Sequence, residues 1–219
     1  MSKINIVGPS FANKTKLCAR ISQKYGIPVM PDLSEFLEHD DQPDMCKAMM
    51  RKLYQEEGRN DQIRKLEGPV VVDNHYFVVL AEIQVAEVEG ILTRPEANML
   101  ADWFHKCHKE FHQVKTFLVM EDPEILMTRS QVAGVEPPSQ SYFNNVCLAW
   151  ERLAAKYEWE IVPAQNGGLV PVEIDEYIKD LLIEKADPVT ETIFPVTQPR
   201  AQDDTPSKSR GTFEMRAGG

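Results

Sequence analysis

Short apolar runs alternate with longer amphipathic stretches along most of the chain. The apolar runs cover residues 4–7, 27–30, 70–73, 115–120 and 159–163. Short, mostly continuous apolar runs are typical of strands that are covered on both faces in a parallel sheet. Because stretches with helical spacing separate these runs, the pattern predicts an α/β fold in which a parallel five-stranded sheet is flanked by helices in three layers.

The helices are expected at residues 14–25, 45–66, 76–89, 95–111, 122–129, from 139 past 154, and 172–183. Gly26 is placed to stop the first of them, and Asp122 and Ser139 are placed as N-caps. Pro95 suits a first helical turn. We expect an interruption of the second helix near Gly58–Asn60. The helix after Ser139 is expected to bury one side, made of Tyr142, Phe143, Val146, Leu148, Trp150, Leu153 and Ala154.

The composition changes near residue 186. The last segment is rich in Pro, Asp, Ser and Gly and has few large apolar residues, so it cannot offset the entropy lost on ordering. We therefore expect one domain over residues 1–185 and a disordered extension over residues 186–219, although Phe194 and Phe213 could dock.

The turn after the first apolar run resembles a phosphate-binding P-loop with one letter changed. Such a loop joins a strand to a helix that opens with Lys and Ser or Thr; backbone amides cradle phosphates and the hydroxyl binds Mg²⁺. Asn13 stands where the motif has its second glycine, and Asn tolerates the positive φ required there. The predicted nucleotide-binding segment is Gly8, Pro9, Ser10, Phe11, Ala12, Asn13, Lys14 and Thr15.

The charge balance is acidic, with 34 Asp and Glu against 24 Lys and Arg, a formal net charge of −10. This field repels polyanions and argues against a protein that coats DNA or RNA. The four cysteines are scattered without a CxxC pair, which suits a reducing compartment. Without a signal-peptide pattern or a membrane-length apolar run, we expect a soluble cytoplasmic protein with no membrane partner.

Two carboxylates follow predicted strands, where ligands bind in parallel sheets. Asp73 ends the third run and is placed to hold Mg²⁺ together with Thr15, either directly or through water. Asp32 follows the second run, where it could serve as a general base or cap the segment Ser34–Leu37. Arg129 precedes a Gly- and Pro-rich stretch and is either a mobile arginine that stabilises transferring charge or a solvated helix-end residue.

Other residue groups carry weaker signals. His105, His108 and His112 share a helix face, which favours an exposed polar surface over a zinc site because the spacing supplies only part of a ligand set. Trp103, Phe104 and Trp150 are expected in the core; as the alternative, an aromatic residue near Asp73 or on the helix that begins at Pro95 could stack on a base.

The order of these parts resembles the thymidylate kinase and deoxynucleoside kinase group over residues 3–183. The segment Val71–Tyr76, followed by Leu80–Gln84, is similar to the Asp-Arg-Tyr/His segment of thymidylate kinases and its downstream helix. The stretch Glu96–Trp103 resembles a helix of deoxynucleoside kinases, and Pro123–Arg129 resembles the passage into the LID of both.

The resemblance implies a P-loop kinase fold and roles for single residues. Lys14 and Thr15 would bind ATP and Mg²⁺, and Asp73 would assist the metal. Asp32 would be the carboxylate on the acceptor side, Gln84 would read a pyrimidine edge, and Arg129 would serve the LID.

Three departures affect the expected acceptor. Asn13 replaces a glycine, Asn74 stands in the place of the family's arginine, and the LID has one arginine instead of several. Fewer cations weaken the grip on a free monophosphate. A viral branch of the family is thought to phosphorylate 5-hydroxymethyluracil in DNA, which would place this chain in the host cytoplasm.

Two classes of function remain open. The first is an ATP- and Mg²⁺-dependent kinase whose acceptor is a thymidine-like nucleoside, a nucleotide, or a modified base in DNA. The second is a degenerate kinase that only binds nucleotide. A homodimer is also open.

Overall fold

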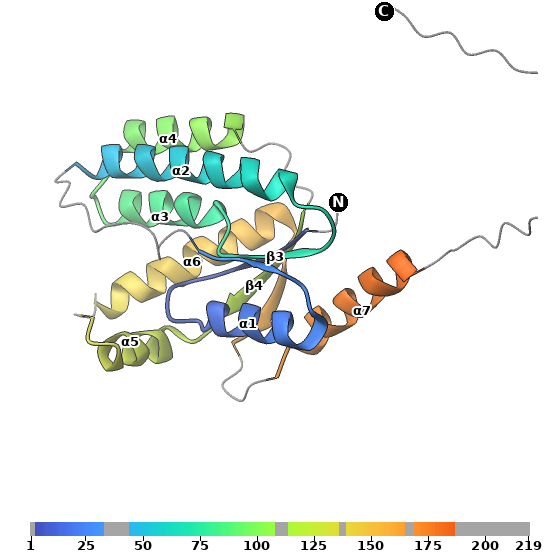
Figure 1. Cartoon of the computed structure of the whole chain (residues 1–219). Coiled ribbons are helices and arrows are strands. Elements are labelled where there is room, and N and C mark those ends of the chain that lie inside the picture. The colour runs from blue at the N-terminus through green and yellow to red at the C-terminus, as the bar shows by residue number, and fades with distance from the viewer. Residues whose placement is uncertain (1–2, 33–43, 108–113, 136–138, 165–168, 187–219) are drawn as a thin grey trace, which may run out of the picture.

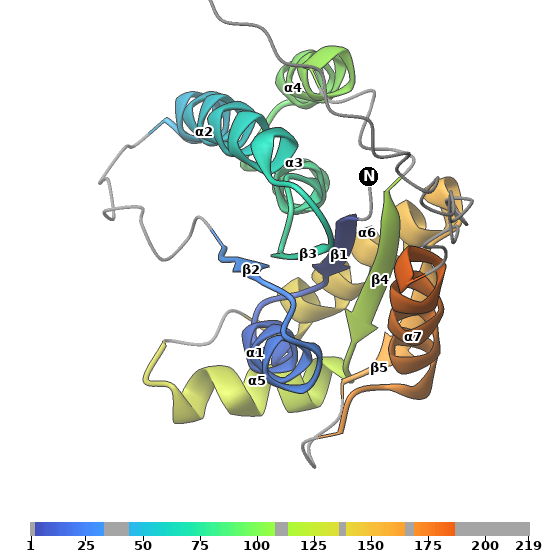
Figure 2. The same ribbon diagram turned by 45° about the vertical axis from the view of Figure 1, so that its right-hand side comes forward.

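The described part of the chain contains one parallel sheet. The computed structural model describes residues 3–32, 44–107, 114–135, 139–164 and 169–186. The strands are β1 (Lys3–Val7), β2 (Val29–Met30), β3 (Val70–Asp73), β4 (Lys115–Met120) and β5 (Glu160–Pro163). They pair in parallel in the order β2-β3-β1-β4-β5, and Figure 2 shows them following one another in this order. The predicted five-stranded parallel sheet is confirmed.

Helices cover both faces of this sheet (Figure 1). They are α1 (Lys14–Tyr25), α2 (Met45–Lys65), α3 (Phe77–Val88), α4 (Arg94–Cys107), α5 (Pro123–Val132), α6 (Gln140–Tyr157) and α7 (Val172–Ala186). Helices α4, α2 and α3 stack on one side, while α1 and α7 lie on the other. The three-layer α/β architecture is therefore as expected.

Each face of the sheet has its own apolar cluster. Val70 and Val72 point toward α2, α3 and α4, whereas Val71, Ile4 and Ile6 pack with α1 and α7. This alternation follows from the period of two along a strand. Helix α6 contributes to both clusters, with Trp150 in the first and Phe143 in the second.

The helix ends follow the local sequence. Gly26 ends α1 in the left-handed conformation, with φ 68°, as its lack of a Cβ allows. Asp122 accepts a hydrogen bond from the Glu124 amide at 2.8 Å, and Ser139 accepts one from the Tyr142 amide at 3.2 Å. Both predicted caps are confirmed.

Three local expectations are wrong. Helix α2 is continuous through Gly58–Asn60, because Arg59 and Asn60 are buried there and form hydrogen bonds that stabilise this turn. Leu148 is 42% exposed, since it lies on the outer side of α6. Strand β2 is half-buried instead of fully buried, because it lies at the edge of the sheet.

The expected extension over residues 186–219 lies outside the described residues, apart from Ala186 at the end of α7. Among the described helices, none combines the length and the apolar character that crossing a bilayer requires.

Candidate functional site

The turn after β1 lies against β4. Gly8 has φ 149°, and a Cβ at this position would come within 2.3 Å of the Val119 carbonyl oxygen. Only glycine fits such a close approach of two backbones. This glycine therefore fixes where the turn leaves the sheet.

Two side-chain-bearing residues of the turn adopt left-handed backbone conformations. Asn13 has φ 60° and ψ 25°, which is the conformation we expected when asparagine replaces the motif's glycine. Phe11 has φ 68°, an uncommon value for a bulky residue that stores strain. Successive amides in such a turn form a concave anion-binding surface in many proteins.

Lys14 is folded into this turn. The residue opens α1 and is 7% exposed, and its Nζ donates a hydrogen bond to the Pro9 carbonyl oxygen at 2.7 Å. Burial lowers the pKa of Lys14, while the carboxylates of Asp73 and Asp32 act in the opposite direction. The lysine ammonium therefore lies inside the loop, within the electrostatic influence of two carboxylates.

Asp73 ends β3 beside the turn of residues 8–15. It pairs in register with Ile6 of β1 and is 1% exposed. Burial raises the pKa of Asp73, whereas the Thr15 hydroxyl and the Lys14 ammonium lower it. The contact between the Thr15 hydroxyl and the Asp73 carboxylate is not a hydrogen bond of good geometry. Neither Asp73 oxygen has such a bond to any described residue. A buried carboxylate in this condition is suited to bind a cation.

Asp32 lies close by, after β2. Its Oδ2 accepts a hydrogen bond from the Nδ2 of Asn74 at 2.6 Å, and Asn74 itself has φ 51°. The alternative in which Asp32 caps Ser34–Leu37 falls on residues outside the described ranges. The structure thus brings together Asp32, Asp73, Lys14 and Thr15.

A buried arginine of α2, which the sequence analysis missed, holds the ends of β2 and β3 together. Arg59 is 3% exposed, and its guanidinium donates to the carbonyl oxygens of Met30, Pro31, Asp73 and Asn74. Because these carbonyls flank Asp32 and Asp73, Arg59 fixes the backbone that carries both carboxylates.

Arg59 also pairs with Glu56 on the same helix. The two side chains are separated by 3.4 Å and almost fully buried. Burial raises the pKa of Glu56 to about 7, and the Arg59 charge opposes this rise. A sequence signal existed: Met49, Leu53, Glu56, Asn60 and Ile63 follow a 4-3-4-3 spacing, so polar residues interrupt the buried face of the helix.

Arg129 reaches the turn of residues 8–15 from α5. Its guanidinium donates to the Phe11 carbonyl oxygen at 2.9 Å and to Glu121 at 2.8 Å. The side chain is 21% exposed, so it is not the solvated helix-end residue of the alternative reading. Its catalytic role stays a prediction.

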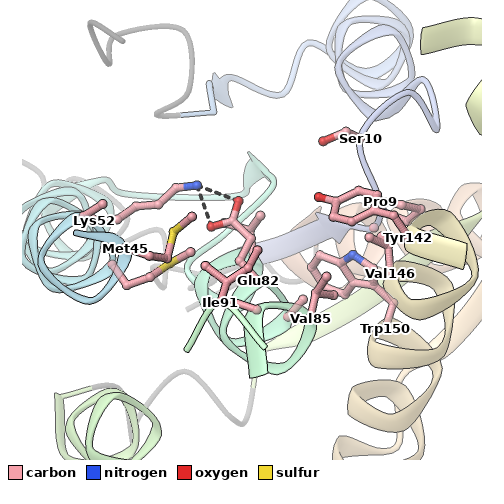
Figure 3. A pocket seen from close by; sticks show the side chains of 16 residues that line it. Pro9, Ser10, Met45, Lys52, Glu82, Val85, Ile91, Tyr142, Val146 and Trp150 are labelled. Carbon is pink, nitrogen blue, oxygen red and sulfur yellow. Dashed lines mark hydrogen bonds and ion pairs between the residues drawn. The ribbon is translucent and has the colours of Figure 1, made fainter. Parts of the chain in front are cut away.

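An apolar cavity of about 380 Å³ opens beside the turn, between α2, α3 and α6. Figure 3 shows Pro9 and Ser10 at one side and the ion pair between Lys52 and Glu82 at the other. Gln84 is not among the lining residues, which from α3 are Val78, Ala81, Glu82, Val85 and Ala86. The role of Gln84 in reading a base edge therefore remains a prediction, and Glu82 is the polar residue of α3 in the cavity.

Of the remaining candidates, only Trp150 reaches this site. Phe104 is fully buried in the core, Trp103 is half-buried, and Trp150 is buried while also lining the cavity. His108 and His112 lie outside the described residues, and no cluster of three metal-binding side chains occurs within the described ranges.

The comparisons with known proteins concern the fold. No protein-family model matches the sequence, and no curated protein matches it. Deoxyadenosine kinase from M. mycoides with bound dATP is similar in structure, with a TM-score of 0.62 and 16% identity over 84% of this chain and 100% of that one. Its complex with the products dCMP and dCDP gives a TM-score of 0.61 and 14% identity, over 83% of this chain and 99% of that chain.

NadR in complex with NR is a further similar structure. It has a TM-score of 0.60 and 13% identity, over 81% of this chain and 51% of that one. At these identities the likeness concerns the three-layer fold and not the chemistry of single residues. The chain therefore has the three-layer fold of these solved structures, which include a deoxyadenosine kinase.

Proposed function

We propose that the chain is a kinase that uses ATP and Mg²⁺ to phosphorylate a hydroxyl of a thymidine-like acceptor. The acceptor is a free deoxynucleoside or deoxynucleotide, or 5-hydroxymethyluracil in viral DNA. The observation that carries the proposal is the Lys14 ammonium, buried inside a strained turn and bonded to the Pro9 carbonyl oxygen. A lysine in this position is the cation that P-loop proteins offer to the β- and γ-phosphates.

The amides of Gly8–Thr15 and the N-terminus of α1 would hold the phosphates of ATP. Lys14 would then exchange its bond to the Pro9 carbonyl for charge-assisted bonds to phosphate oxygens. Arg129, which already contacts the Phe11 carbonyl oxygen, would approach the transferring group from the side of α5 and stabilise its negative charge.

The residues present fit a magnesium ion. Asp73 offers two buried carboxylate oxygens with no hydrogen bond of good geometry to the described residues, and the Thr15 hydroxyl is its neighbour. Mg²⁺ prefers oxygen ligands and binds through one or two protein groups plus phosphates and water. When bound, it would neutralise charge on the phosphates.

Asp32 would act on the acceptor side. The acceptor hydroxyl oxygen would attack the γ-phosphorus while the bond to the β,γ-bridging oxygen breaks, and the hydroxyl proton would pass to the Asp32 carboxylate. Asn74 donates to Oδ2 of Asp32 at 2.6 Å and would keep the carboxylate oriented. The cavity beside Pro9 and Ser10 would hold the base of the acceptor.

A degenerate nucleotide-binding module is the second candidate. The observation in its favour is Asn74, which stands where the resemblance expects an arginine and which is bonded to Asp32. Such a module would bind ATP without forming a phosphorylated product.

One transfer experiment separates these candidates. Radiolabelled ATP and Mg²⁺ are incubated with the full chain and thymidine, dTMP, deoxyguanosine, or duplex DNA with and without 5-hydroxymethyluracil. We expect label on at least one thymidine-like acceptor. Bound ATP with no labelled product in any arm would favour the module and overturn the kinase.

A further inference from the structure

The cavity beside the P-loop is an apolar slot with a polar pair at its side. Most of its lining is apolar, including Met45, Met49, Val85, Val146 and Trp150. Its volume of about 380 Å³ lies in the range that holds small organic ligands. Flat aromatic walls and aliphatic side chains favour a planar, uncharged ring system.

The charges that line this cavity cancel. Lys52 is the single cation among the described lining residues, and Glu82 is the single carboxylate. The Lys52 Nζ lies 2.6 and 2.7 Å from the two Glu82 oxygens, so the two groups form an ion pair with each other (Figure 3). A ligand therefore meets a neutral pair and not a free ammonium.

The third ionisable residue of the lining does not change this balance. Burial, assisted by the nearby Glu82 and Glu89 carboxylates, raises the pKa of Tyr142. The phenol is consequently protonated at neutral pH. It can donate a hydrogen bond but supplies no charge.

A phosphate dianion meets no unpaired cation among the described side chains that line this cavity. Burying an anion is costly unless a cation or several donors compensate for the lost water, and arginine is the usual residue for this task. The described lining contains no arginine. On the side of the turn of residues 8–15, the Asp73 and Asp32 carboxylates already interact electrostatically with the Lys14 ammonium. These two carboxylates would repel the phosphate of an acceptor monophosphate.

We infer that the cavity selects an uncharged nucleoside-type group and rejects a free 5′-monophosphate, and that the ion pair of Lys52 and Glu82 sets this selection. This inference rests on the proposed function, because it narrows the acceptor of that site. A free nucleoside and a base presented from DNA share the required chemistry. A free nucleotide does not.

The test measures binding without ATP, by calorimetric titration of the full chain. Thymidine is compared with dTMP, and deoxyguanosine with dGMP, so that each pair differs only in the phosphate. A single-stranded oligonucleotide with one 5-hydroxymethyluracil, and its thymine counterpart, form the last arms. We expect at least one uncharged group to bind, and each nucleoside that binds to do so about tenfold or more tightly than its monophosphate.

Two variants should move this preference in opposite directions. Glu82→Gln leaves Lys52 unpaired, so the preference for nucleoside over monophosphate should fall by about tenfold. Lys52→Met leaves a lone carboxylate, so the preference should rise. Glu87→Gln makes the same change on the same helix outside the cavity lining and should leave the preference unchanged.

Each outcome either supports or overturns the inferred preference of the cavity for an uncharged nucleoside-type group. Binding of thymidine points to a free nucleoside, and binding of only the modified oligonucleotide points to a base in DNA; both support the inference. Monophosphates that bind as tightly as nucleosides, a Glu82→Gln variant that melts normally but keeps the wild-type preference, or no binding in any arm would overturn it. ATP binding, measured separately, tests the proposed kinase function alone.

Discussion

At the scale of a single residue, Gly8 determines how closely the turn after β1 approaches β4. A methyl group at this position would meet the Val119 carbonyl oxygen at 2.3 Å, and the backbone has φ 149°. Gly8→Ala should therefore lower the free energy of unfolding by roughly 2–4 kcal/mol, from overpacking and backbone strain. Urea unfolding followed by circular dichroism measures this change.

Gly58→Ala is the matched control. Gly58 lies inside α2, and a Cβ there would meet nothing within 4 Å. Alanine in a helix interior should stabilise the protein by roughly 0.5–1 kcal/mol. Equal effects of the two substitutions would show that the contact at Gly8 is not the cause.

The backbone conformation of Asn13 could be predicted from the sequence, because the motif of the turn requires a positive φ at that position. Asn13 was expected at positive φ, and it has φ 60°. The left-handed Phe11 was not predicted, because nothing in its side chain favours that conformation. Its φ is set by the path of the turn between Gly8 and α1.

At the scale of secondary-structure elements, helix α2 holds the ends of β2 and β3 together through Arg59. Arg59→Met should remove four hydrogen bonds to carbonyls at the ends of β2 and β3 and leave Glu56 buried without its partner. We expect a loss of about 3–5 kcal/mol in the free energy of unfolding, as for a broken buried ion pair. Denaturant titration gives this value.

Arg64→Met on the same helix provides the comparison. Arg64 forms an exposed i,i+3 pair with Asp61, and such pairs contribute about 0–1 kcal/mol. If the Arg59 variant were as mild as the Arg64 variant, the guanidinium would not hold the two strand ends.

The elements themselves were largely predictable, whereas the contacts between them were not. Apolar runs and caps placed every described strand and helix to within a few residues. The reach of Arg59 from α2 to β2 and β3 depends on tertiary packing, which periodicity along the chain does not encode. The pairing of Lys52 with Glu82, thirty residues apart, was missed for the same reason.

At the scale of the whole molecule, the acidic net charge of −10 makes the turn of residues 8–15 a local exception. Polyanions are repelled over most of the surface, while the turn at Gly8–Thr15 presents amides, a helix N-terminus and Lys14. The alternation of strands and helices was sufficient to predict the three-layer fold. The cavity could not be predicted, because it forms only where α2, α3 and α6 meet beside the turn.

The most direct test of this account is the affinity of the full chain for ATP in the presence of Mg²⁺. Wild type is compared by calorimetry with Lys14→Ala and with Lys16→Ala, whose lysine lies on the exposed side of α1. We predict that wild type and Lys16→Ala bind ATP with similar affinity, and that Lys14→Ala, folded as judged by its melting curve, binds it about tenfold to hundredfold more weakly. Equal affinity of the two variants, or no ATP binding by wild type, would contradict it.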